Sequence, residues 1–215
     1  MARATIIFVL LLILIMGSGT VGFAITNAEE KPSLFSQVLP GYVYQFPKDF
    51  YSHDDFRIEW WYYTGNLEEE KTTRPFGYQL TFFRVALDKK DINPNPSKWK
   101  VGHVYFAHMT LTDIDGEQFY YFERINRKGI GNAGADSDRL MVWNEDWLLE
   151  GKDNLHSLKA VESGTGIELQ LVPEKRLVIH GENGISKKGK EKVNASHYFS
   201  YTRMKTNGMI FVKGK

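Results

Sequence analysis

The stretch DFRIEWWYYTGNL, residues 55–67, decides the fold class of this chain. It is dense in aromatic and β-branched side chains, which favour a strand over a helix. It closes on Thr64-Gly65-Asn66, residue types that are common in turns. The pattern therefore predicts a strand that runs into a turn at these three residues.

Alternation along this strand gives it two different faces. The first face mixes charges with aromatic rings and consists of Arg57, Glu59, Trp61 and Tyr63. The second face is apolar enough to be core and consists of Phe56, Ile58, Trp60 and Tyr62. The mixed face fits the wall of a ligand pocket as well as a solvated sheet surface, and the sequence leaves both open.

Strand patterns recur along the rest of the chain at short spacing. Residues 77–87 place Tyr78, Leu80, Phe82 and Arg84 on one face. A tight hairpin at Asp115-Gly116 joins residues 101–113 to 117–125. Residues 140–150 read as one strand that carries Trp143 and Trp147, and a last hairpin pairs residues 195–204 with 209–212 across Thr206-Asn207-Gly208.

These patterns predict an all-β protein, because no segment keeps a helical period. The architecture expected for many short antiparallel strands is a sandwich or a barrel. We expect an extended N-terminal arm at residues 25–45 and the β domain at residues 46–215.

Composition excludes several classes of protein. The chain has 215 residues, a formal net charge of +1 and 42% hydrophobic residues, which allows a sizeable core and gives no electrostatic reason to expect nucleic acid as a partner. It has no cysteine, so disulfides, a cysteine nucleophile and a lipid-modified N-terminal cysteine are ruled out. No phosphate-binding or dinucleotide-binding glycine motif is present, and we expect no cofactor.

The first residues predict export. Arg3 precedes an uncharged run from Thr5 to Met16, and small residues follow it, as in a signal peptide of residues 1–24 cleaved after Ala24. The alternative is an uncleaved segment that stays as an N-terminal membrane anchor. We therefore expect a periplasmic or extracellular protein that meets a membrane only through an uncleaved signal.

The histidines give two hypotheses about chemistry. The six histidines are scattered at spacings that do not match a metal site, so no metal is expected. His108 shares a polar face with Phe106, Thr110 and Thr112 in residues 101–113. If that face turns inward, His108 could meet Glu59 or Arg84 and exchange a proton, and the alternative is a histidine satisfied by a neighbouring hydrogen bond.

Several blocks of the sequence together resemble the AttH/CrtC family, which contains carotenoid 1,2-hydratases and predicted secreted hydrolases. The blocks are Phe46-Pro47-Lys48-Asp49, residues 59–67 (EWWYYTGNL), residues 77–84 (GYQLTFFR), residues 107–113 (AHMTLTD) and residues 196–203 (SHYFSYTR). They extend over nearly the whole mature chain.

The resemblance implies a fold of two lipocalin-like β-barrels in tandem, of which this chain matches the N-terminal half. The hydratases of the family protonate a terminal carbon–carbon double bond of an apolar polyene, and water then adds to the cation. The aspartate motif associated with that acid belongs to the second half, and we find no equivalent in this sequence. A second lipocalin-like half, or self-association, is therefore an expected partner.

Two functions are carried forward from the sequence. The first is an exported AttH/CrtC-like protein that binds an apolar small molecule, a hydratase or hydrolase that is incomplete in this chain. The second is a non-catalytic lipophilic-ligand-binding or envelope-associated module of the same fold. The candidate catalytic residues are Glu59 and His108, and the candidate ligand-binding residues are Trp61, Tyr63, Arg84, Trp143 and Tyr201.

Overall fold

The computed structural model describes residues 35–87, 101–128, 131–189 and 194–213, all within one compact unit of residues 33–215. Apart from the short 3-10 helix η1 (Lys48–Phe50), the regular structure of these residues is strand. The prediction of an all-β fold is confirmed. No helix in the described ranges is long and apolar enough to cross a bilayer, and the predicted signal peptide and anchor lie outside those ranges.

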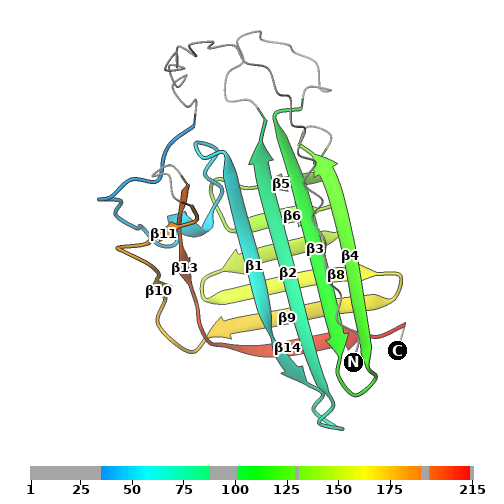
Figure 1. The fold of residues 1–215 in the computed structure, drawn as a ribbon. Helices are drawn as coiled ribbons and strands as arrows, with labels where there is room; N and C mark the ends of the chain where they lie inside the picture. The colour runs from blue at the N-terminus through cyan, green and yellow to red at the C-terminus, as the bar shows by residue number, and fades with distance from the viewer. Residues whose placement is uncertain (1–34, 88–100, 129–130, 190–193, 214–215) are drawn as a thin grey trace, which may run out of the picture. The chain divides into compact units, whose positions relative to one another are not determined.

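Two antiparallel sheets make up most of the structure (Figure 1). The four-stranded sheet has the order β1 (Ile58–Glu68), β2 (Pro75–Ala86), β3 (His103–Asp113), β4 (Gln118–Arg127). The six-stranded sheet has the order β14 (Met204–Phe211), β9 (Thr165–Pro173), β8 (Leu155–Glu162), β7 (Trp147–Lys152), β6 (Met141–Asn144), β5 (Ala133–Ala135). Two short pairs complete the strands: β10 (Val178–Ile179) with β13 (Phe199–Ser200), and β11 (Ile185–Lys187) with β12 (Ala195–His197).

The hydrophobic core lies between the two sheets, whose strands run across one another in Figure 1. The four-stranded sheet contributes fully buried side chains such as Leu80 and Met109, and the six-stranded sheet contributes Trp147 and Leu149. This arrangement of two facing antiparallel sheets is the lipocalin-like fold predicted from the sequence. Tyr78, Leu80, Phe82 and Arg84 share one face of β2, as predicted, and the structure shows that this is the inner face, because all four are buried.

The face of β1 that was interpreted as core points outward, and the mixed face points inward. Trp61 and Tyr63, on the mixed face, pack against the core together with Leu67. The face interpreted as core points outward instead, with Ile58 53% and Tyr62 39% exposed. That interpretation was wrong because the inward face must supply the carboxylate of Glu59 to a cation on β2, as described below.

Two glycines that suggested turns lie inside strands. β1 continues through Thr64-Gly65-Asn66 to Glu68, and a Cβ on Gly65 would lie 3.1 Å from the ring of Tyr78 on the paired strand. β14 likewise continues through Thr206-Asn207-Gly208, and Gly208 has a φ of +152° with Glu168 O only 2.1 Å from where its Cβ would be. Both glycines serve close approach between strands, so the predicted turns there were wrong.

Two further assignments need correction, and one hairpin is confirmed. Residues 140–150 form two strands, β6 and β7, with Glu145 in the left-handed region between them. The predicted last hairpin does not form, because β14 pairs with β9, and β12 and β13 pair with β11 and β10. The hairpin at Asp115-Gly116 is confirmed by the pairing of Asp113 with Gln118.

A hydrogen bond between Tyr63 and His156 joins the two sheets inside the core. The Tyr63 hydroxyl of β1 lies 2.6 Å from Nδ1 of His156 on β8. His156 is only 4% exposed, and its burial lowers its pKa from the ordinary 6.5 to about 4. The folded protein therefore holds this ring neutral at any pH above that value.

We predict that His156 makes the fold sensitive to acid. Its folded pKa lies below its unfolded value, so the stability linked to it is complete above pH 6.5 and is lost as the pH falls towards 4, by about 3 kcal/mol in total. In urea unfolding at a series of pH values, His156→Gln should be less stable at pH 7 but lose less stability between pH 6.5 and 4. The control His108→Gln, at a side chain 33% exposed, should keep the wild-type slope, and an unchanged slope in His156→Gln would contradict the assignment.

Candidate functional site

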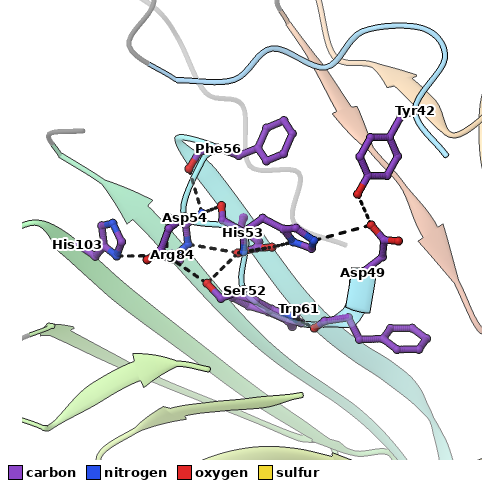
Figure 2. Close-up of polar contacts among 11 residues, drawn as sticks. Tyr42, Asp49, Ser52, His53, Asp54, Phe56, Trp61, Arg84 and His103 are labelled. Carbon is purple, nitrogen blue, oxygen red and sulfur yellow. Dashed lines mark hydrogen bonds and ion pairs between the residues drawn. The ribbon is translucent and has the colours of Figure 1, made fainter. Parts of the chain in front are cut away.

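A buried arginine is the centre of a charged network at the beginning of β1 (Figure 2). Arg84 of β2 is 0% exposed and lies directly opposite Glu59 of β1 in the strand register. Its Nε donates to Oε2 of Glu59 at 3.2 Å, and its Nη2 donates to the carbonyl oxygens of His53 at 2.7 Å and Phe56 at 2.9 Å. The guanidinium therefore holds both the carboxylate and the segment that leads into β1.

Glu59 accepts hydrogen bonds from several groups at once. Besides Arg84, it accepts from the backbone amide of His53 at 3.0 Å, the Ser52 hydroxyl at 3.3 Å and, at 2.7 Å, Nδ1 of the His53 ring. Ser52 and His53 reach it because the chain between η1 and β1 folds over the end of the strand. These donors fix the position of the carboxylate, which in turn orients the His53 ring.

His53 is the group in the network that can hold and release a proton. Its hydrogen bond to Glu59 is the main cause of a pKa raised above the ordinary value, and burial opposes it. With Nδ1 donating to Glu59, the other nitrogen, Nε2, faces Oδ1 of Asp49 at 3.8 Å. The side chain is 30% exposed, so its proton can exchange with solvent or with a bound molecule.

Asp49 is the second carboxylate of the network. It lies in η1 with its side chain only 5% exposed, and it accepts from the Tyr42 hydroxyl and from the backbone amide of Gln45. Burial first, and then this carboxylate, raise the pKa of Tyr42. The chain of contacts thus runs from Tyr42 through Asp49 and His53 to Glu59 and Arg84 (Figure 2).

Aromatic rings adjoin this network through Tyr42, whose hydroxyl donates to Asp49. We call them the arm cluster, and its members are Tyr42, Tyr44, Phe46, Phe50, His197 and Phe199. Phe46 lies 5.0 Å from both Phe50 and Phe199 between ring centroids, and Tyr42 lies 4.3 Å from His197. Tyr42 is 38% and Phe46 39% exposed, so the cluster presents apolar surface beside a protonatable ring.

Three of the candidate ligand-binding residues converge behind this cluster. Trp61 donates from Nε1 to the carbonyl oxygen of Phe50 at 2.9 Å. The ring of Tyr201 lies 5.9 Å from that of Phe50 and 5.9 Å from that of His156, which also bonds Tyr63. The structure therefore brings Trp61, Tyr63 and Tyr201 together around Phe50 and His156.

Two predicted site residues lie elsewhere. His108 is on the outer face of the four-stranded sheet, with Nε2 4.0 Å from Glu123 and its ring 5.5 Å from that of Phe83. The expected contact with Glu59 or Arg84 was wrong, because Tyr105, Ala107, Met109 and Leu111 occupy the inner face of β3. Trp143 lies on the face of β6 opposite to the buried Val142 and donates from Nε1 to the carbonyl of Gly131 at 3.0 Å.

The sequence did not identify the residues that complete the network: Tyr42, Asp49, Ser52 and His53. A usable signal was present, since Asp49 and His53 are four residues apart and shortly precede Glu59. In the described part of the chain, no three side chains of the metal-binding types lie together so that they could hold a metal ion. The network combines two carboxylates and a guanidinium with a protonatable imidazole.

Comparison with known proteins places the chain in a family. The AttH-like family model matches residues 37–215. A crystal structure of an AttH candidate from Nitrosomonas europaea is 33% identical, with a TM-score of 0.74 over 84% of this chain. This chain covers 54% of that protein, so it spans about half of its length. A search of curated proteins found no significant match. The chain belongs to the AttH-like family.

Proposed function

We propose that this protein binds an apolar small molecule against the arm cluster and that His53 exchanges a proton with the bound molecule. One observation carries the proposal: His53, whose pKa is raised by its hydrogen bond to Glu59, turns its second nitrogen toward Asp49, and its ring lies 6.5 Å from that of Phe56, which contacts His197 of the arm cluster. Aromatic rings give an apolar ligand a large contact area, and they stabilise a cation formed beside them.

Two reaction classes fit a proton at this position. Hydration of a carbon–carbon double bond and hydrolysis of an acyl bond both move a proton between water and an apolar substrate. In each, His53 would act as the acid or the base, and Glu59 and Arg84 would orient it. The AttH-like relative from Nitrosomonas europaea is longer, so further catalytic groups from a second lipocalin-like half belong to this proposal.

A binding function without catalysis is the second candidate, and the hydrogen bonds of the two carboxylates favour it. Glu59 accepts from Arg84, Ser52 and His53, and Asp49 accepts from Tyr42 and Gln45. Both carboxylates therefore already serve as hydrogen-bond acceptors within the protein, which fits a structural role. In that case the network only fixes the segment that carries the arm cluster.

Replacement of His53 distinguishes these two functions. We use retinyl acetate, an apolar polyene ester whose fluorescence reports binding and whose hydration or hydrolysis changes its mass. In the catalytic case, His53→Gln should lower turnover by about 100-fold or more while affinity changes by less than about threefold. His108→Gln, on the opposite face of the sheet, is the matched control and should leave both unchanged.

The outcomes separate clearly. Binding without turnover in the wild-type protein would favour the non-catalytic function. Loss of turnover in His108→Gln but not in His53→Gln would contradict the assignment of His53.

The stability of the protein should also depend on the protonation of His53. Its folded pKa is raised, so the stability linked to its charge is complete below pH 6.5 and is lost as the pH rises through the folded pKa. The difference in unfolding free energy between wild type and His53→Gln should therefore be largest at pH 6 and shrink towards pH 9. Urea unfolding at several pH values measures it, and a difference independent of pH would contradict the His53–Glu59 ion pair.

Export through residues 1–24 is part of the same proposal. A cleaved signal peptide would leave Ile25 as the first residue of the mature protein, whereas an anchor would retain Met1. N-terminal sequencing of the protein isolated from its producing cells decides between them. An unprocessed N-terminus would contradict cleavage and favour the membrane anchor.

A partner for the chain is likewise proposed: a second lipocalin-like half, or a second copy of this chain. Sedimentation of the purified protein with and without retinyl acetate tests the second copy. A dimer supports self-association, and a monomer that binds the probe fully contradicts it.

A further inference from the structure

Three buried polar atoms of the four-stranded sheet have no hydrogen-bond partner among the described residues. They are Nη1 of Arg84, Nδ1 of His103 and the hydroxyl of Tyr105. The backbone amide of Ala135 lies near the Tyr105 hydroxyl, but without the geometry of a hydrogen bond. Arg84 and Tyr105 are both 0% exposed, and the His103 side chain is 13% exposed. Buried polar groups are nearly always paired in folded proteins, so three such atoms in one region call for a common partner.

The three side chains share the inner face of the sheet. Arg84 and Tyr105 are direct partners in the register of β2 and β3, and His103 precedes Tyr105 by two residues on the same face. The rings of His103 and Tyr105 are 6.4 Å apart. Cross-strand neighbours on one face lie close enough for their side chains to meet at a shared group.

Asp54 joins this group from the surface. Its Oδ1 lies 3.8 Å from Nη1 of Arg84 and also 3.8 Å from Nδ1 of His103 (Figure 2). Both separations are too long for a direct hydrogen bond, and a polar gap of this kind is where an intervening oxygen is expected. The Asp54 side chain is 55% exposed, so the region can be reached from solvent beside it.

We propose that Arg84, His103, Tyr105 and Asp54 form a binding site for a single hydroxyl oxygen. Such an oxygen can accept from Nη1 of Arg84 and from the Tyr105 hydroxyl, and it can donate to the Asp54 carboxylate. Burial favours the neutral form of His103, so one of its ring nitrogens is an acceptor. The site is separate from the His53–Glu59 contact, although the same guanidinium serves both.

The chemistry of the site selects a hydroxyl over a carboxylate ligand. A carboxylate would satisfy Arg84 and Tyr105, but it would bring a second negative charge next to Oδ1 of Asp54. A hydroxyl carries both a proton to give and lone pairs to accept, which matches donors on one side and a carboxylate on the other. The hydroxyl comes either from a water molecule or from the head of an alcohol ligand.

Removal of the Tyr105 hydroxyl tests whether the site is occupied. If the hydroxyl holds a bound oxygen, Tyr105→Phe should lower the melting temperature by about 2–4 °C, the shift typical of one lost buried hydrogen bond in a domain of this size. If the hydroxyl is instead unpaired, it destabilises the folded protein, because its lost hydrogen bonds to water are not replaced. Its removal should then leave the melting temperature unchanged or raise it. That result would overturn the proposal. Tyr120→Phe is the matched control, because Tyr120 is a half-buried tyrosine on the inner face of β4, in the same sheet as Tyr105. This variant should change the melting temperature little.

A high-resolution crystal structure of the wild-type protein gives a second and direct test. One oxygen should lie within hydrogen-bond distance of Nη1 of Arg84 and of the Tyr105 hydroxyl, and it should be lost in Tyr105→Phe. Direct contacts between the protein groups themselves, with no such oxygen, would overturn the proposal even if the variant were unstable.

Two probe ligands distinguish the sources of the hydroxyl. If an alcohol head group occupies the site, 1-octanol should bind up to about tenfold more tightly than methyl octyl ether, and Tyr105→Phe should abolish this preference. Equal affinities, together with an isolated oxygen in the crystal, identify the occupant as water. Either source supports the site.

Discussion

Burial of the Arg84 guanidinium is the constraint on which the rest of this structure depends. A cation that is 0% exposed must be paired, and Glu59 on the neighbouring strand supplies the charge. This requirement turns the mixed face of β1 inward, and the alternation of the strand then turns Ile58 and Tyr62 outward. An electrostatic demand at one residue pair therefore decides which aromatic side chains join the core and which meet solvent.

Features that depend on local sequence patterns were predicted well, whereas features that depend on which distant strands pair were not. The Asp115-Gly116 hairpin and the grouping of Tyr78, Leu80, Phe82 and Arg84 on one face of β2 depend on neighbouring residues and alternation, and both were predicted from the sequence. The turns expected at Gly65 and Gly208 were not found, because a glycine that allows two strands to approach looks the same in sequence as one that makes a turn. Only the paired strand reveals the difference.

The candidate site was predicted in part for the same reason. Glu59 and Arg84 were both chosen from the sequence as site residues, but their ion pair across adjacent strands was not predicted. His53 comes from an irregular segment, where no periodicity reports the direction of a side chain. The prediction for His108 was wrong for a different reason. Its strand was predicted, but its polar side chain was expected to turn inward, where small and apolar neighbours fill the core.

The shared position of Arg84 determines how its two sites can be studied. Its Nε and Nη2 fix Glu59 and the segment before β1, while its Nη1 faces Asp54. A substitution of Arg84 would leave the Glu59 carboxylate buried without its cation, a loss of about 3–5 kcal/mol that would disturb both sites together. Because the guanidinium is rigid and planar, a group bound at Nη1 also influences the orientation of Nε against Glu59. If the proposed hydroxyl site is occupied, we therefore expect its occupancy and the proton on His53 to influence one another through this side chain.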